Sequence, residues 1–121
     1  YEDNSVVKQT LAESAQGKVL VVDGGGSLNC ALLGDMLGVM ARDNGWQGIV
    51  VYGCVRDVEI LRTIDIGVRA LQPHPMKSEK RGRGQRDVSV HFANVEIKPG
   101  HFLYADENGI AVADRDLGAD F

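Results

Sequence analysis

The sequence predicts an α/β fold with a parallel α/β first half and a β-rich second half. Short apolar runs alternate with segments of helical periodicity up to about residue 71, an order typical of parallel strands joined by helices. After residue 87, apolar and polar side chains alternate instead, which is typical of half-exposed strands. A length of 121 residues suits one domain, residues 1–121, and no internal repeat or linker divides it.

The first half is expected to hold three helices and three strands. Asn4 or Ser5 can cap a first helix whose apolar residues recur every four positions, with Gly17 as its end. A second helix is expected over about residues 31–44, ended by Gly45. Its apolar stripe consists of Leu33, Leu37, Met40 and Ala41. The remaining elements are strands at 18–22, 48–52 and 67–71 and a short helix at 57–63.

The second half is expected to hold strands joined by turns. Residues 88–92 alternate between apolar and polar, and residues 95–97 continue the pattern. A Lys-Pro-Gly turn at 98–100 leads to a strand at 102–105. The run from Asp106 to Gly109 is a strong turn signal before a last strand at 110–113.

Asp35 and the Arg56-Asp57 pair are the strongest candidates for a functional site. Twenty residues separate Asp35 from Arg56, and each candidate follows apolar strand residues that give way to a helix or turn. Ligand sites of α/β sheets gather at the carboxyl ends of strands, where glycine lets the backbone approach a ligand. Two carboxylates and a guanidinium there could hold a divalent cation and a small anion. The alternative is a surface salt bridge and a helix-starting aspartate.

Other motifs give weaker signals. The Asp23-Gly24-Gly25-Gly26 run follows a strand but lacks the spacing of a dinucleotide or phosphate loop, so we expect a tight turn with closely packed backbone or exposed amides. Ser27 has no histidine or acid at a spacing that would suggest a serine nucleophile. The three histidines lack metal-ligand spacing, although His74 begins a basic loop and could reach a site.

Composition excludes several classes of protein. No apolar run approaches the roughly 20 residues of a membrane span, and no signal segment is expected. Cys30 and Cys54 lack the spacing of a zinc site or a disulfide framework, which favours a reducing, cytoplasmic setting. The net charge of −4 argues against a general nucleic-acid binder.

The segment 77–86 (KSEKRGRGQR) departs from this acidic balance, with five of the thirteen basic residues and one acid. Such a cluster could meet phosphates, an acidic protein or an anionic substrate. The alternative is a solvated, mobile loop. No aromatic residue lies within it, so base stacking is not expected.

Several longer motifs resemble the RraA-like family. The resemblance runs from about Gly17 to Ala113 and rests on the stretches GKVLVVDGGGS (17–27), ALLGD (31–35), NGWQGIVV (44–51), GCVRD (53–57) and LYADENG (103–109). That family includes class II 4-hydroxy-4-methyl-2-oxoglutarate aldolases and the regulator of ribonuclease E activity A. The resemblance implies a layered α/β/β fold of the swivelling-domain type, a homotrimer or dimer of trimers with sites between subunits, and an N-terminal segment that this chain lacks.

The resemblance also separates two functions. Family aldolases carry an aspartate, twenty residues and then Arg-Asp, a pattern that Asp35, Arg56 and Asp57 satisfy. Regulators without lyase chemistry lose the carboxylate after the arginine. The resemblance therefore implies a metal-dependent lyase that cleaves 4-hydroxy-4-methyl-2-oxoglutarate, or a related 4-hydroxy-2-oxo acid, to pyruvate. The alternative is a non-catalytic regulator that binds and inhibits ribonuclease E or an RNA helicase.

Retro-aldol chemistry needs an electron sink, and the residues favour a metal for it. No lysine lies in an apolar strand where desolvation would prepare it for a Schiff base, so a metal Lewis acid is the simpler choice. Mg²⁺, with Mn²⁺ as the alternative, suits a site with one or two carboxylates. We expect Asp57 to bind the metal, Arg56 to hold the substrate carboxylate and steady the enolate, and Asp35 to orient the water that acts as base.

Two further expectations follow from this chemistry. Backbone amides at a helix start would complete an anion pocket for pyruvate or oxaloacetate; they belong to Gly34, Asp35, Met36 and Leu37. Oxaloacetate decarboxylation passes through the same pyruvate enolate, so it is the expected side activity.

Overall fold

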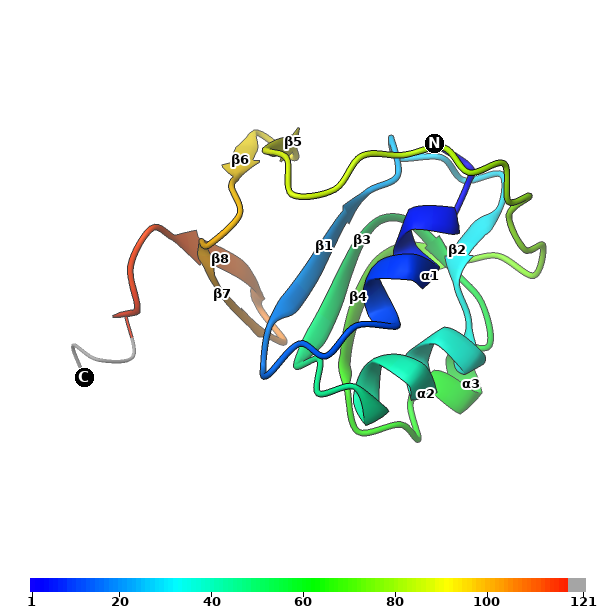
Figure 1. Cartoon of the computed structure of the whole chain (residues 1–121), viewed down its shortest axis with the longest axis horizontal. Helices are drawn as coiled ribbons and strands as arrows, with labels where there is room; N and C mark the ends of the chain where they lie inside the picture. The colour runs from blue at the N-terminus through cyan, green and yellow to red at the C-terminus, as the bar shows by residue number, and fades with distance from the viewer. Residues whose placement is uncertain (118–121) are drawn as a thin grey trace. The chain divides into compact units, whose positions relative to one another are not determined.

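The computed structural model describes residues 1–117 and divides into two units, residues 1–85 and a second unit that begins at Arg86. Figure 1 shows the helices and the parallel sheet of the first unit and the short hairpins of the second. The expectation of a single domain over residues 1–121 without an N-terminal segment stays a prediction.

A four-stranded parallel sheet forms the centre of the first unit. Its strands are β1 (Val19–Asp23), β2 (Ala31–Leu33), β3 (Gly48–Val55) and β4 (Gly67–Pro73). Residues 48–51 of β3 pair with both β1 and β4, so these two strands lie along opposite edges of β3. β2 pairs with the end of β3, at Cys54 and Val55. Because every pair is parallel, the carboxyl ends of β2, β3 and β4 meet at one edge of the sheet, as the strand order predicts.

Three helices cover one face of this sheet: α1 (Ser5–Leu11), α2 (Asp35–Asp43) and α3 (Val58–Leu61) (Figure 1). Side chains from the helices and from alternate positions of β3 form a continuous buried core, as expected for a strand whose alternate residues point to opposite faces. The buried members of the core are Val7, Leu11, Leu32, Leu33, Ala41, Ile49, Val51, Val55, Leu61 and Ile64.

The prediction of a helix from residue 31 was wrong, because residues 31–33 form strand β2 and the helix begins at Asp35. The apolar run Ala-Leu-Leu fits a helical stripe and a buried strand equally well, and distant partners decide between them. The Leu33 carbonyl accepts the Arg56 N–H at 2.8 Å, and Ala31 bridges to Lys77. Leu33 therefore belongs to the sheet, while the other members of the expected stripe lie on α2.

The first helix is shorter than predicted, and its cap is a different residue. α1 ends at Leu11, not near Gly17, because the chain beyond it bonds to the end of α2 through Ala15 N–H to the Asn44 carbonyl, 2.9 Å. Asn4 occupies the N-cap position without a capping bond from its side chain. Asp3 supplies that bond instead, because its Oδ1 accepts the Ser5 N–H at 2.9 Å.

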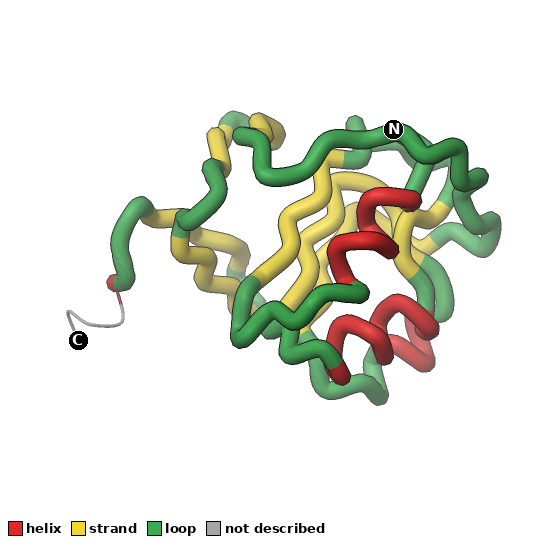
Figure 2. The backbone as a smooth tube through the Cα atoms, in the orientation of Figure 1, coloured by secondary structure: helices red, strands yellow, loops and turns green. Residues whose placement is uncertain are grey.

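The second unit consists of two antiparallel hairpins, drawn as paired strand segments in Figure 2. The first pairs β5 (Val90–Phe92) with β6 (Val95–Ile97), and the second pairs β7 (Phe102–Asp106) with β8 (Gly109–Ala113). The β-rich second half is confirmed, and with it the predicted fold class. Within the described residues, no helix has the length and apolar character that crossing a membrane requires.

Candidate active site

The carboxyl ends of β2 and β3 bring Asp35 and the Arg56-Asp57 pair together. The Arg56 N–H donates to the Leu33 carbonyl at 2.8 Å, which aligns the two strand ends. Just beyond this bond, two residues after Leu33 and one after Arg56, the Asp35 N–H donates to Asp57 Oδ2 at 3.1 Å. Residues separated by about twenty positions in sequence thus form one site by direct contact, as the strand-end hypothesis expects.

The Arg56 guanidinium lies beside the Asp57 carboxylate without being bound to it. Nε is 3.9 Å from Asp57 Oδ2, which is too long for a hydrogen bond. The two side chains keep 36% and 28% of their surface exposed. A loosely paired, half-exposed guanidinium keeps its planar set of donors available for an incoming carboxylate.

Asp57 has a left-handed backbone, with φ 57° and ψ 40°, at the start of α3. This conformation is uncommon for residues other than glycine, although aspartate and asparagine tolerate it best. The Asp57 carbonyl accepts the Leu61 N–H at 2.8 Å, and its carboxylate holds the Asp35 amide. The fold therefore fixes this residue from two sides in a conformation that costs energy, which is common at functional sites.

Gly34 provides the space in which both charged side chains lie. A Cβ at this position would be 2.8 Å from Asp57 Oδ2 and 3.0 Å from Arg56 Nε. The backbone of Gly34 is extended, with φ −133°, so its conformation alone does not require glycine. A side chain at this position would instead displace the Asp57 carboxylate or the Arg56 guanidinium from its place.

The start of α2 was expected to offer amides to an anion, and two of these amides already have partners. The Asp35 N–H donates to Asp57, and the Met36 N–H donates to Asp35 Oδ1 at 2.8 Å. Met36 is 78% exposed, whereas Leu37 packs against the core. A bound anion would compete with these carboxylates, and the expected anion pocket of Gly34 to Leu37 stays a prediction.

The few carboxylates of the site suit an ion that keeps part of its water shell, such as Mg²⁺, better than an ion that is bound by protein ligands alone. Among residues 1–117, no three His, Cys, Asp or Glu side chains lie close enough to hold a metal together. Asp57 Oδ2 has its amide partner, while Oδ1 makes no hydrogen bond to any described residue. Mg²⁺ binds through one or two carboxylates and retains several waters, so Asp57, with Asp35 beside it, matches this requirement.

A groove of about 470 Å³ is lined by residues of α3 and β4 and of the segment between them. Val55 and Val58, which flank the Arg56-Asp57 pair, line one part of it, and Arg62 and Arg69 line another. Apolar walls with a few cationic groups are typical of pockets for small anionic ligands. Asp35, Arg56 and Asp57 are not among the residues that line the groove, so it is a neighbour of the site and not a part of it.

His74 lies at the third strand end of this edge. It follows β4, and its N–H donates to the Val55 carbonyl at 2.8 Å. Its Nδ1 accepts the Met76 N–H at 3.1 Å, so in the neutral ring Nε2 carries the proton. The sequence signal that could have placed His74 beside the site is the parallel order of the strands, because His74 directly follows β4.

The amides of the glycine-rich turn after β1 form hydrogen bonds within the chain. Gly24 and Gly26 each donate their N–H to the Tyr52 carbonyl at 3.1 Å, and Gly25 donates to Asp23 Oδ1 at 2.9 Å. A side chain at Gly25 would lie 2.7 Å from the Tyr1 ring. The expected tight turn is therefore present, and its amides are directed at internal acceptors.

A parallel sheet whose adjacent strand ends carry an aspartate and an Arg-Asp pair defines a class of α/β protein, and the comparisons identify the family. The profile of the RraA-like family, described as aldolase/RraA, matches residues 1–112. The chain belongs to the RraA-like family.

Similar proteins carry different functional names. A protein of Alkalilimnicola ehrlichii, provisionally named 4-hydroxy-4-methyl-2-oxoglutarate aldolase, is 59% identical over 97% of this chain and 73% of its own length. The RNA-processing inhibitor RraA from Thermus thermophilus is 49% identical over 94% of this chain and 70% of that one, with a TM-score of 0.92. A Geobacillus kaustophilus structure named S-adenosylmethionine:2-dimethylmenaquinone methyltransferase is 44% identical over 98% of this chain and 74% of that one, with a TM-score of 0.96.

Proposed function

We propose that this protein is a divalent-metal-dependent lyase that cleaves 4-hydroxy-4-methyl-2-oxoglutarate, or a related 4-hydroxy-2-oxo acid, to pyruvate. The observation that carries the proposal is the Asp35 N–H to Asp57 Oδ2 contact of 3.1 Å with the Arg56 guanidinium beside it. It assembles two carboxylates and a cation at one strand-end edge. The aldolase names of relatives at 55–59% identity support the same activity.

The proposed reaction breaks the bond between C3 and C4 of the substrate. The C4 hydroxyl loses its proton and becomes a ketone, and the electron pair of the broken bond forms the enolate of pyruvate. Protonation of that enolate at C3 then yields pyruvate, so atoms and electrons balance. With 4-hydroxy-4-methyl-2-oxoglutarate, the other product is a second pyruvate.

The chain's own residues divide this work among them. Arg56 holds the substrate's 2-oxo carboxylate through two parallel N–H donors, a geometry that a guanidinium offers and an ammonium does not. Asp35 orients the water that takes the C4 hydroxyl proton. The left-handed backbone of Asp57 and the open space at Gly34 keep both charged side chains on the same side of the strand ends.

Asp57 would hold the metal, which we propose to be Mg²⁺ or, alternatively, Mn²⁺. When bound, the metal supplies a Lewis acid that stabilises negative charge on the keto oxygen during cleavage. Oxaloacetate loses carbon dioxide from C4 to give the same enolate. We therefore include oxaloacetate decarboxylation as a side activity of the proposed site.

Pyruvate release from oxaloacetate and from 4-hydroxy-4-methyl-2-oxoglutarate tests the proposal. Release should require Mg²⁺ or Mn²⁺, stop with EDTA and return when the metal is restored. Equal turnover in metal-free buffer containing EDTA would contradict a metal-dependent lyase. The spontaneous decarboxylation of oxaloacetate, which Mg²⁺ itself accelerates, is subtracted with a protein-free blank.

A second candidate function is regulation of RNA processing, which the name of the Thermus relative favours at 49% identity. In this role, the protein would bind ribonuclease E or an RNA helicase and inhibit it. Inhibition of a purified ribonuclease E by the Asp57→Asn variant, which should lack turnover, would support a separate regulatory role. The methyltransferase name of the Geobacillus structure adds no third proposal, because the amides of the glycine-rich turn after β1 already have internal acceptors.

We also propose a homotrimer, or a dimer of trimers, in the cytoplasm. Light scattering after size-exclusion chromatography measures the assembly directly. Cys30 and Cys54 are buried free thiols, and burial raises the pKa of the Cys30 thiol, with a further contribution from the Glu2 carboxylate. Buried thiols that are not joined in a disulfide are typical of proteins from a reducing compartment, which supports this proposal.

A further inference from the structure

The basic segment 77–86, called the cationic strap from here on, is tied to the N-terminus of the chain. Asp3 Oδ2 accepts the N–H groups of Arg81 at 2.9 Å and Arg83 at 3.1 Å. The Ser5 hydroxyl accepts the Gly82 N–H at 3.0 Å. The backbone of the strap is therefore held by residues more than seventy positions away, and the alternative of an unattached solvated loop does not describe it.

Two further contacts extend this attachment. Ser78 is buried, and its hydroxyl accepts the Asn4 N–H at 3.2 Å. Gly84 packs so closely on α1 that a Cβ there would lie 2.7 Å from Val6 Cγ2. The strap thus follows the N-terminal residues over most of its length.

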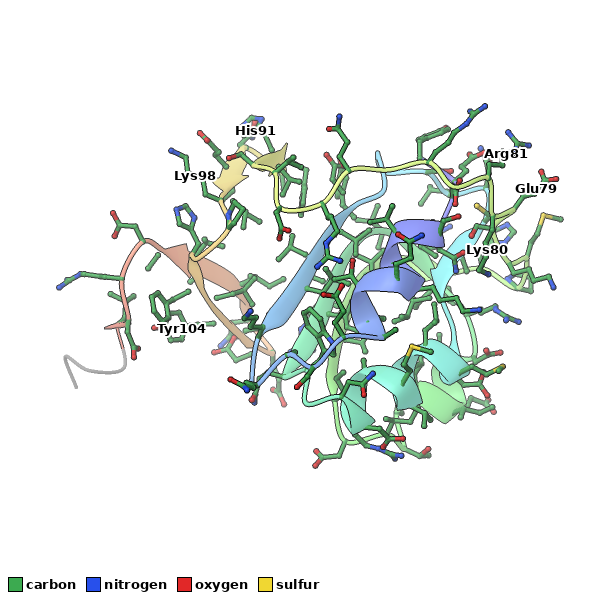
Figure 3. The ribbon with its side chains drawn as sticks, in the orientation of Figure 1. Glu79, Lys80, Arg81, His91, Lys98 and Tyr104 are labelled. Carbon is green, nitrogen blue, oxygen red and sulfur yellow. The ribbon has the colours of Figure 1, made fainter. Side chains whose placement is uncertain are left out.

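The charged side chains of the strap are exposed, and two of its five basic residues, Arg81 and Arg86, form ion pairs with acidic residues. Arg81 pairs with Glu79 at 2.6 Å, and Figure 3 labels these two residues with Lys80 at the same end of the first unit. Lys77, Lys80 and Arg83 form no ion pair or hydrogen bond through their side chains with any described residue. These three cations stand on a backbone that the fold already holds in place. A ligand that binds them therefore loses less affinity to the ordering of the strap.

We propose that the cationic strap is a preformed docking surface for a short acidic peptide segment of a partner protein. Its ammonium and guanidinium groups would bind Asp or Glu side chains, and the Asp3 attachment would hold them in a fixed arrangement. This role is separate from the proposed lyase chemistry, which uses none of Lys77, Lys80 and Arg83.

Charge distribution favours a short acidic peptide over a nucleic acid. The strap carries a net charge of +4 and the whole chain −4, so the remainder carries −8. A long polyphosphate that extends past the strap would meet this negative remainder, whereas a short carboxylate segment would not. The strap also has no aromatic residue on which bases could stack.

Fluorescence anisotropy with a fluorescein-labelled octaglutamate peptide tests the charge contribution. The Lys80→Ser/Arg83→Ser variant should bind the peptide about tenfold more weakly at low salt, as expected for two lost surface ion pairs. The Lys18→Ser/Lys98→Ser variant, which loses the same charge elsewhere, should bind like the wild type. Equal weakening in both variants would overturn the assignment to the strap, and pyruvate release should be unchanged in both.

Substitution of Asp3 separates a preformed surface from simple charge attraction. Asp3→Asn removes a negative charge next to the strap, so attraction alone predicts tighter binding. A preformed surface predicts weaker binding, because the amide cannot replace the carboxylate that fixes Arg81 and Arg83. Ser5→Ala, which changes no charge, should weaken binding as well and serves if Asp3→Asn fails to fold.

A direct comparison of RNA with an acidic peptide tests which kind of partner the strap binds. A labelled single-stranded RNA octamer, compared at equal salt, should bind more weakly than the octaglutamate peptide. Tighter binding of the RNA, or unchanged peptide binding by folded Ser5→Ala, would overturn the proposal. Failure of these tests leaves the EDTA-sensitive release of pyruvate unaffected, so the two proposals are judged separately.

Discussion

Asp57 and Asp3 both accept backbone N–H groups from distant segments, and they differ in what remains of each carboxylate. Asp57 accepts one amide on Oδ2, leaves Oδ1 without a partner among the described residues and keeps 28% of its side chain exposed. Asp3 uses both oxygens, for the Ser5 amide and hydroxyl and for two strap amides, and its residue is 8% exposed. The first carboxylate can still bind a ligand, and the second cannot without breaking internal bonds.

The internal bonds of Asp3 also affect its own ionisation. The Ser5 hydroxyl, then its amide and the amides of Arg83 and Arg81, hold the pKa of the Asp3 carboxyl well below its usual range. Strong solvation by the protein's own donors identifies a carboxylate that stabilises the fold. A partly solvated carboxylate on a strained backbone, such as Asp57, is the one to expect in a reaction.

Asp57→Asn should have the largest effect on activity and a small effect on folding. Asparagine keeps an oxygen for the Asp35 N–H and tolerates the left-handed backbone, but it loses the charge that binds the metal. We expect kcat/KM for oxaloacetate to fall roughly 100-fold or more, equivalent to a ~3 kcal/mol electrostatic contribution. Isothermal titration with Mn²⁺ should show weakened metal binding with an unchanged thermal midpoint.

The matched control for this prediction is Asp43→Asn. Asp43 lies at the end of α2, is 60% exposed and pairs with Arg42 at 2.9 Å, so its loss should alter activity little. Near-normal rates for Asp57→Asn at saturating Mg²⁺ would remove Asp57 from the metal site. The Asp57 carboxylate would then serve only to hold the Asp35 amide.

Arg56→Lys should weaken substrate binding and slow turnover while the fold stays intact. Lysine keeps the charge but loses the planar pair of donors that a carboxylate fits. A lost charge-assisted hydrogen bond corresponds to about a 10- to 30-fold fall in kcat/KM, divided between a higher KM and a lower kcat. Arg42→Lys is the control, and unfolding of Arg56→Lys alone would indicate a structural role.

Gly34→Ala should reduce activity by about tenfold, because the new methyl group must displace the Asp57 carboxylate or the Arg56 guanidinium. Its Cβ would lie 2.8 Å from the first and 3.0 Å from the second. Gly67→Ala is the matched control, since its Cβ would approach no atom more closely than 3.9 Å. Steady-state kinetics and Mn²⁺ titration of both variants measure the effect, and equal activity would show that the space at Gly34 is not needed.

The sequence was sufficient to locate a strand wherever its local pattern and its packing in the fold agree. Apolar runs bounded by glycine located β1, β3 and β4, and alternation located the hairpins of the second unit. The prediction failed at residues 31–33, because three apolar residues fit a helix and a strand equally well. Pairing with β3 makes them a strand. At the site, strand order could bring Asp35 to Arg56, but no local signal announces the left-handed backbone of Asp57.

The cationic strap shows the same limit more strongly. Glycine, lysine and arginine in one run are typical of a mobile loop, and their composition contains nothing about Asp3 or Ser5. The attachment depends on contacts over 77 to 80 positions of sequence. The one local sign was Asp3 two residues before Ser5, a spacing at which an aspartate caps a helix start.

Asp3→Asn should change stability more than activity, and the change should depend on pH. Because the folded state lowers the pKa of Asp3, the unfolded chain binds its proton first as pH falls. The contribution of Asp3 is therefore complete above the ordinary aspartate pKa of about 3.9 and is lost progressively below it. Thermal unfolding of wild type and Asp3→Asn should differ most near neutral pH, with the variant less stable, and the two curves should converge as the pH falls below that value.

Glu96→Gln, which removes an exposed carboxylate 3.8 Å from Lys98, should follow the wild type throughout. A constant difference between wild type and Asp3→Asn down to strongly acidic pH would show that the ionised carboxylate does not hold the strap, while unchanged pyruvate release at neutral pH would keep Asp3 apart from the site of Asp57.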